Sequence, residues 1–140
     1  MGRPATPEDV DAICRSLPEV ELGTSWGDRP TYLVRGRGFL LFRAPDRHAL
    51  DPVTGQPYED LLVITTPDMD AKEALVADPS LPFFTIDHFR RTSAVLLSQS
   101  RLGELDVEEL RAVVTDAWAA RAPKRLVREH LADLEGGTDG

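Results

Sequence analysis

The chain has 140 residues, of which 41% are hydrophobic and 29% charged, and its formal net charge at pH 7 is −8. This length supports one hydrophobic core, and the composition is too apolar for a disordered chain. We therefore expect one domain over residues 1–134 and a disordered, glycine-rich tail at residues 135–140. No apolar run approaches the roughly 20 residues of a membrane helix, and the first residues lack a signal-peptide pattern, so we expect a cytoplasmic, monomeric protein with no membrane partner.

Helix signals open the chain. Thr6 offers an N-cap hydroxyl and Pro7 suits the first helical position. An apolar stripe follows at helical spacing until Pro18, which predicts a helix over residues 7–17. Cys14 lies on that stripe, so we expect it to be a core thiol.

Strand signals dominate the middle of the chain, where β-rich runs alternate with turn-forming residues. These runs cover residues 30–35, 38–43, 60–66, 83–86 and 93–99. Gly36 and Arg37 separate the first two runs, which predicts a tight hairpin with an arginine at its tip. Residues 44–59 are rich in proline, glycine and aspartate and predict a loop. The continuous apolar middle of residues 60–66 predicts a strand inside the sheet.

Further helix signals follow the third and fifth runs. Thr66 resembles an N-cap for a short helix that ends near Ala77. Asp106 and Glu109 form a capping-box pattern before an amphipathic helix that places Trp118 in the core, and residues 124–134 add a last helix. Trp26 either covers one side of the hydrophobic core or lies partly exposed, where its ring can stack on another group. The order of elements predicts an α+β fold, a two-layer α-β sandwich whose mainly antiparallel sheet has its helices packed on one face.

Motifs for catalysis, nucleotide binding and metal binding are missing. Gly36-Arg37-Gly38 lacks the third glycine and the following helix of a phosphate loop, and no G-x-S-x-G nucleophile motif occurs. Metal-site spacing is absent around the isolated histidines His48, His88 and His130. A carboxylate ridge for a hard cation is one interpretation of the acids Glu8, Asp9, Asp11, Glu19 and Glu21, and a solvated helix face is the other. We expect no enzymatic activity, no cofactor and no metal site.

Basic residues are concentrated in two stretches despite the acidic balance. Residues 29–47 hold five arginines and one acid, and residues 88–101 hold three arginines and no acid. Arginine suits phosphate because its planar fork binds two oxygens at once. The alternative is that these side chains are solvated or pair with the excess acids.

Several segments together resemble the MmcQ/YjbR family of small bacterial domains. They are the first helix ending at Ser16-Leu17-Pro18, the Trp26-Gly27 and 30–39 segment, residues 82–88 with the basic residues after them, and residues 114–118. The resemblance covers about residues 6–128. It implies a CyaY-like (frataxin-like) fold and binding to double-stranded DNA, with hairpins as paired wings.

The basic stretches and the resemblance predict the same site. We expect strand ends and the last helix to present phosphate-contacting side chains, namely Arg35, Arg37, Arg90, Arg91, Lys124 and Arg125. Two alternatives remain open. One is a protein-interaction module, and the other is a small-ligand or metal-binding module suggested by the frataxin-like fold.

Overall fold

A five-stranded antiparallel sheet in the order β1-β2-β3-β4-β5 forms the centre of the computed structural model, which describes residues 3–25, 29–43, 45 and 49–138. The strands are β1 (Val20–Ser25), β2 (Arg29–Val34), β3 (Arg37–Phe42), β4 (Leu61–Thr65) and β5 (Ala94–Ser98). The helices are α1 (Pro7–Ser16), α2 (Met69–Ala77), α3 (Val107–Arg121) and α4 (Lys124–Thr138), with short 3-10 helices η1 (Asp87–Phe89) and η2 (Gln99–Glu104).

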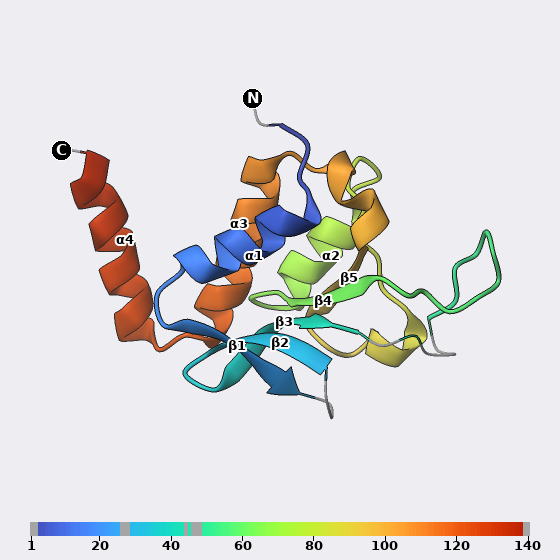
Figure 1. Ribbon diagram of the computed structural model, residues 1–140, viewed down its shortest axis with the longest axis horizontal. Helices are drawn as coiled ribbons and strands as arrows, with labels where there is room; N and C mark the ends of the chain where they lie inside the picture. Colours follow the sequence, from blue (N-terminus) through green and yellow to red (C-terminus); the bar gives the residue numbers. More distant parts are fainter. Residues whose placement is uncertain (1–2, 26–28, 44, 46–48, 139–140) are drawn as a thin grey trace.

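Three helices cover one face of the sheet. Figure 1 shows α1, α2 and α3 together above the strands, whereas α4 projects from one end of the sandwich. This arrangement confirms the predicted α+β sandwich with a mainly antiparallel sheet. Within the part of the chain that the structure describes, no helix is long and apolar enough to cross a membrane.

Alternate residues of β4 enter two different hydrophobic clusters. Leu62 and Ile64 are completely buried in the main core beneath the helices. Leu61 points to the other face, where it joins a smaller cluster with Phe89 and Ala49 from the connecting segments. Because both faces of β4 are covered, its apolar run is continuous, as expected for an interior strand.

Capping contacts set the start of α3, as the sequence predicts. The carboxylate of Asp106 accepts a 2.8 Å hydrogen bond from the backbone N–H of Glu109, whose own carboxylate accepts one of 3.0 Å from the N–H of Asp106.

Trp118 lies fully buried on the apolar face of this helix, and its indole N–H donates to the carbonyl oxygen of Pro18 at 3.0 Å. Cys14 is also buried, which raises the pKa of its thiol to about 12. Both core predictions are therefore confirmed, while Trp26 lies outside the described residues.

The β2–β3 hairpin turn lies one residue earlier than predicted. Arg35 and Gly36, rather than Gly36 and Arg37, are its two central residues, with φ angles of 52° and 79°. Two positive φ values define the turn type that matches the twist of a two-residue hairpin, and glycine adopts this conformation without steric cost. Arg37 is consequently the first residue of β3 and pairs with Val34.

Other element boundaries also differ from the predictions. β1 was not predicted, because Gly23 and the flanking polar residues weaken its strand signal. The N-cap of α2 is Asp68 rather than Thr66, since the Asp68 carboxylate accepts a 2.8 Å bond from the N–H of Ala71. Residues 83–86 contribute one isolated bridge, from Phe84 to Leu96, instead of a strand.

The last helix continues beyond the predicted domain end at residue 134. Residues 135–138 belong to α4, which ends at Thr138, where the sequence predicted the start of a disordered tail. Glycine lowers helix stability by about 1 kcal/mol relative to alanine but causes no clash, so the glycines after Glu135 do not end the helix on steric grounds.

Candidate nucleic-acid interface

The strand registers bring the two predicted basic stretches to the same end of the sheet. β3 runs antiparallel to β4, so its first residue, Arg37, lies toward the end of β4 at Thr65. Thr65 pairs in turn with Ala94, the first residue of β5. Arg90 and Arg91 precede Ala94 in the chain, separated from it by Thr92 and Ser93. We call this region, defined by the β2–β3 turn, the end of β4 and the start of β5, the turn end of the sheet.

A hollow of about 170 Å³ lies at the turn end and joins the two stretches. Gly38 and Thr92 both line it, and they directly follow Arg37 and Arg91 in the chain. Its lining residues come from β3, β4, the segment before β5 and the end of α3, and are Gly38, Phe39, Leu40, Leu41, Val63, Thr65, Phe89, Thr92, Ala94 and Arg121. Arg37 and Arg91 are therefore each adjacent in the chain to a residue that lines one concave surface.

The segment that carries Arg90 and Arg91 is tied to the helical layer through its backbone. The buried Lys72 of α2 donates hydrogen bonds of 2.6 Å to the carbonyl oxygens of Phe89 and Thr92. The carbonyl oxygen of Ser93 accepts from the hydroxyl and the N–H of Thr66 at 2.8 and 2.7 Å. These hydrogen bonds hold the backbone of the segment in place. The side chains of Arg90 and Arg91 are exposed to solvent.

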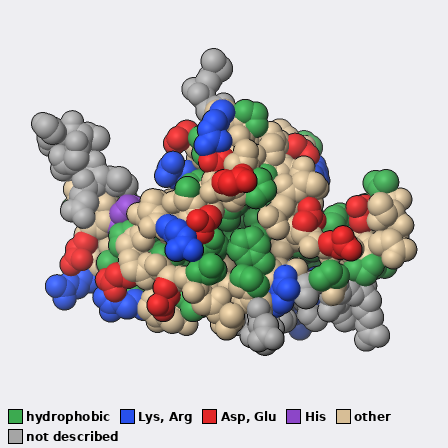
Figure 2. Space-filling model, viewed as in Figure 1, with side chains coloured by type: hydrophobic (Ala, Val, Ile, Leu, Met, Phe, Trp, Pro, Cys, Tyr) green, Lys and Arg blue, Asp and Glu red, His purple; other side chains and the backbone are tan. Residues whose placement is uncertain are grey.

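Two other predicted residues, Arg35 and Arg125, lie at a separate hollow of about 280 Å³ beside α4. Each forms an ion pair there. Arg35 binds Glu19 through two nitrogens, which lowers the pKa of that carboxyl, and Arg125 binds Glu129 at 3.1 Å. Around the start of α4, Figure 2 shows blue basic side chains interspersed with red acidic ones. These pairs reduce the local positive charge.

Four of the predicted residues keep unpaired charges. In the described ranges, no acceptor or ion-pair partner contacts Arg37, Arg90, Arg91 or Lys124, all of which are exposed. An exposed guanidinium without a partner retains its full capacity for phosphate, whereas a paired one must first release its carboxylate. The predicted set therefore divides into four free and two paired cations.

The acids around α1 are held by specific partners. Asp9 accepts from Arg3 and from Thr6, and Asp11 accepts from the hydroxyl of Tyr32 and from Arg15 at 2.8 Å. Among the residues that the structure describes, no group of three or more metal-ligating side chains is arranged to hold an ion. Asp9 and Asp11 are thus engaged by specific donors, as Glu19 is by Arg35, and these contacts give no support to a cation ridge.

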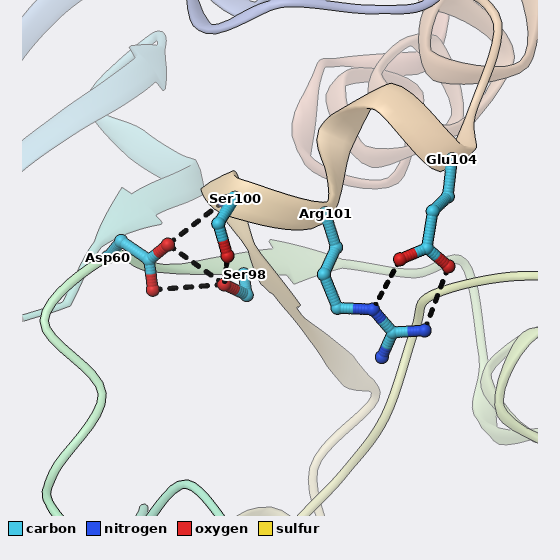
Figure 3. Close-up of polar contacts among 5 residues, drawn as sticks. All are labelled: Asp60, Ser98, Ser100, Arg101 and Glu104. Carbon is cyan, nitrogen blue, oxygen red and sulfur yellow. Dashed lines mark hydrogen bonds and ion pairs between the residues drawn. The ribbon is translucent and has the colours of Figure 1, made fainter. Parts of the chain in front are cut away.

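A second polar cluster lies at the opposite end of the sheet, where β4 begins and β5 ends (Figure 3). The carboxylate of Asp60 accepts hydrogen bonds from the hydroxyl of Ser98 at 2.8 Å and from the N–H of Ser100 at 2.9 Å. Arg101 and Glu104 form a separate pair at 2.7 Å.

This cluster forms one wall of an open hollow of about 800 Å³ beside residues 51–60. Its groups satisfy one another, and the Asp60 carboxylate caps the start of η2. A serine nucleophile is commonly activated by a histidine, whereas the group in contact with Ser98 here is the Asp60 carboxylate. His130, the one histidine whose side chain is described, instead packs edge-on against Trp118. These contacts explain the cluster as a structural feature that holds the end of β5 and the start of η2.

Sequence reasoning missed two residues of the turn end. Arg121 lines the hollow from the last turn of α3, and Lys72 anchors the basic segment from α2. Lys72 carried only a positional signal, because it lies three residues from both Met69 and Leu75 in a helix that also holds Asp70 and Glu73. No local pattern distinguished Arg121, whose position depends on how α3 crosses the sheet.

Comparison with known proteins gives a family but no described activity. The YjbR family model matches residues 15–120. The proteins named "Uncharacterized protein Rv2570" of Mycobacterium tuberculosis and "Uncharacterized protein Mb2600" of Mycobacterium bovis are each 37% identical over 134 residues, covering 92% of this chain and 98% of theirs. No solved structure matches the chain significantly.

Proposed function

The chain belongs to the YjbR family, and from this premise we propose that it is a non-enzymatic protein that binds double-stranded DNA through its backbone phosphates. The proposed contacts are those of the six basic residues, with Arg37, Arg90, Arg91 and Lys124 as the principal ones. We also propose that it acts as a monomer in the cytoplasm.

The observation that carries this proposal is that the segments with the exposed residues Arg37 and Arg91 meet at the concave turn end. Two segments about 50 residues apart in the chain bring these cations to the same end of the sheet, and among the described residues no acid lines the hollow between the segments. A DNA backbone presents closely spaced phosphates, so clustered free arginines suit it better than isolated ones.

The net charge of −8 limits the affinity of such a surface. Acidic regions elsewhere repel the duplex, and the two paired arginines contribute little until their carboxylates are displaced. We therefore expect binding in the range of non-specific complexes, with Kd roughly 10⁻⁴ to 10⁻⁶ M at physiological salt. The dependence on salt should be steep, because phosphate contacts release counterions.

Fluorescence anisotropy of a labelled duplex tests the proposal. The wild-type protein is titrated at about 50 mM and about 200 mM salt, a range over which phosphate-dominated binding weakens by orders of magnitude. The double variant Arg37→Glu with Arg91→Glu should lose binding at both salt concentrations.

A matched variant controls for net charge. Arg101 and Arg111 form surface ion pairs with Glu104 and Glu108, and Arg101 follows β5, away from the turn end. Changing both to glutamate alters the net charge by the same amount, so it should weaken binding much less than the turn-end pair. No binding by the wild type at low salt, or equal losses in both double variants, would overturn the proposal and favour a protein or small-molecule partner.

A further inference from the structure

We propose that the hollow at the turn end is a site for a single phosphate group and that Arg121 is its central ligand. This inference deepens the proposed function and rests on it only where the phosphate comes from DNA. Arg121 is absent from the set of residues predicted from the sequence, and it enters the hollow from the helical layer rather than from a strand end.

The first argument is an unsatisfied donor. The Nε atom of Arg121 is buried, and no acceptor for it exists among the residues that the structure describes. A buried donor left without a partner costs about 1 to 3 kcal/mol, more when the group is charged. Nor does the described part of the chain offer its guanidinium a carboxylate. Because Nε itself is buried, an oxyanion in the hollow would contact this guanidinium through its Nη atoms, for which the described residues provide no acceptor either.

The second argument is the chemistry of the walls. Among the described residues that line this hollow, Arg121 is the one ionisable residue, and the others are apolar, glycine or threonine. Thr65 and Thr92 add hydroxyl groups, of which that of Thr92 donates to the Phe89 carbonyl, and Arg37 and Arg91 directly precede the lining residues Gly38 and Thr92. Positive charge without any lining acid, in partly apolar surroundings, favours an anion over a cation or a neutral ligand.

The other hollows lack this combination. The one beside α4 already holds Glu129 against Arg125, and the large one near β5 is lined by Asp51, Glu59 and Asp60. Each contains carboxylates that compete with an incoming anion. The hollow at the turn end therefore has the lining best suited to an oxyanion.

The size of the hollow points to one group rather than a whole cofactor. Its volume of about 170 Å³ is well below the roughly 300 Å³ at which pockets for drug-sized ligands begin. A phosphate group fits this description whether it belongs to a DNA backbone, to a phosphate monoester or to free inorganic phosphate.

Inorganic phosphate is the first probe. Titration of ¹⁵N-labelled protein should shift the Nε–H signal of Arg121 and the amide signals of Gly38 and Thr92, with saturation. Arg121→Gln should weaken this binding at least tenfold. Arg121→Lys keeps a positive charge at the end of α3 but lacks the Nε–H and the guanidinium fork, so it should bind phosphate clearly less well than the wild type. This variant replaces Arg121→Gln in the test if the glutamine variant does not fold.

Arg111→Gln is the matched control, because Arg111 lies on the same helix but is exposed and near Glu108. It should leave phosphate binding unchanged. Absence of saturable shifts in the wild type would overturn the inference. So would Arg121 variants that bind phosphate as tightly as the wild type.

A duplex titration of the same variants identifies the source of the phosphate. Loss of duplex binding in Arg121→Gln, together with loss of phosphate binding, supports a backbone phosphate as the ligand. Phosphate binding by a wild-type protein that does not bind duplex supports the site while overturning the proposed function. Duplex binding that is unaffected by Arg121→Gln overturns the assignment of DNA to this hollow and leaves the proposed function standing.

Discussion

The ammonium group of Lys72 donates a 2.6 Å hydrogen bond to the carbonyl oxygen of Phe89 and so connects α2 to the segment before β5. A second bond of 2.6 Å reaches the carbonyl oxygen of Thr92. The two acceptors bracket Arg90 and Arg91. Lys72 is only 3% exposed, and burial lowers the pKa of its ammonium. One buried cation thus fixes both ends of the exposed basic segment.

Replacement of Lys72 by methionine should loosen this segment. The change keeps an unbranched side chain but removes the ammonium. The Phe89 carbonyl still accepts from the N–H and the hydroxyl of Thr92, both at 3.0 Å, so the main loss is the bond to the Thr92 carbonyl, and an unsatisfied buried group costs about 1 to 3 kcal/mol. We expect a lower free energy of unfolding in urea and faster hydrogen exchange at the amides of residues 89–93. Lys124→Met removes the same charge from an exposed position, so its effect should stay within about 0.5 kcal/mol. Equal stability of the two variants would contradict the anchoring role.

Glu19 should act as an internal competitor of DNA for Arg35. It holds the Arg35 guanidinium through two hydrogen bonds, one of them 3.0 Å between Nη2 and Oε2. Glu19→Gln should therefore free a cation, raise duplex affinity and steepen the logarithmic salt dependence by up to about 0.9, the value for one additional phosphate contact.

The control for this prediction is Glu8→Gln, which makes the same charge change in the first turn of α1, where no described side chain pairs with Glu8. Anisotropy titrations at several salt concentrations give both slopes. Arg35 makes no phosphate contact if the two variants show the same slope.

Gly36 should be intolerant of a side chain for backbone reasons alone. Its φ angle is 79°, and a Cβ atom built there would meet nothing within 4 Å. The expected loss for Gly36→Ala is therefore the intrinsic cost of the left-handed conformation, about 1 to 2 kcal/mol. Gly103 also has open space around it but no positive φ, so Gly103→Ala should be neutral or stabilising. Urea unfolding compares the two, and similar losses would show that packing rather than conformation is responsible.

Local patterns in the sequence predicted the α+β class and most of the elements, but they missed β1. The capping box at Asp106 and Glu109 and the apolar run of β4 each act within a few residues, so their signals can be read without the fold. The hairpin turn was misplaced by one residue because Arg35, a non-glycine residue, adopts a positive φ that propensity alone does not favour.

The candidate site was less predictable, because it depends on contacts between distant segments. The two arginine-rich stretches were visible in the sequence, but their approach to one hollow follows from the strand registers. The pairing of Arg35 with Glu19 and the entry of Arg121 from α3 are tertiary contacts that no local pattern encodes. Only the structure therefore shows which arginines are paired with a carboxylate and which are not.

Acid should destabilise the N-terminal end of α1 through Asp9. A hydrogen bond from Arg3 is the main cause that holds the pKa of this carboxyl well below its ordinary value, and the N–H and hydroxyl of Thr6 contribute further. Because the folded pKa lies below the unfolded value of about 3.9, the stabilisation is complete above that pH and is lost as the pH falls toward the folded pKa. Asp9→Asn should thus lower the urea midpoint relative to the wild type at about pH 7, and the gap should narrow at about pH 3. A gap for Asp9→Asn that is equal at both pH values would exclude this carboxylate as a source of acid sensitivity.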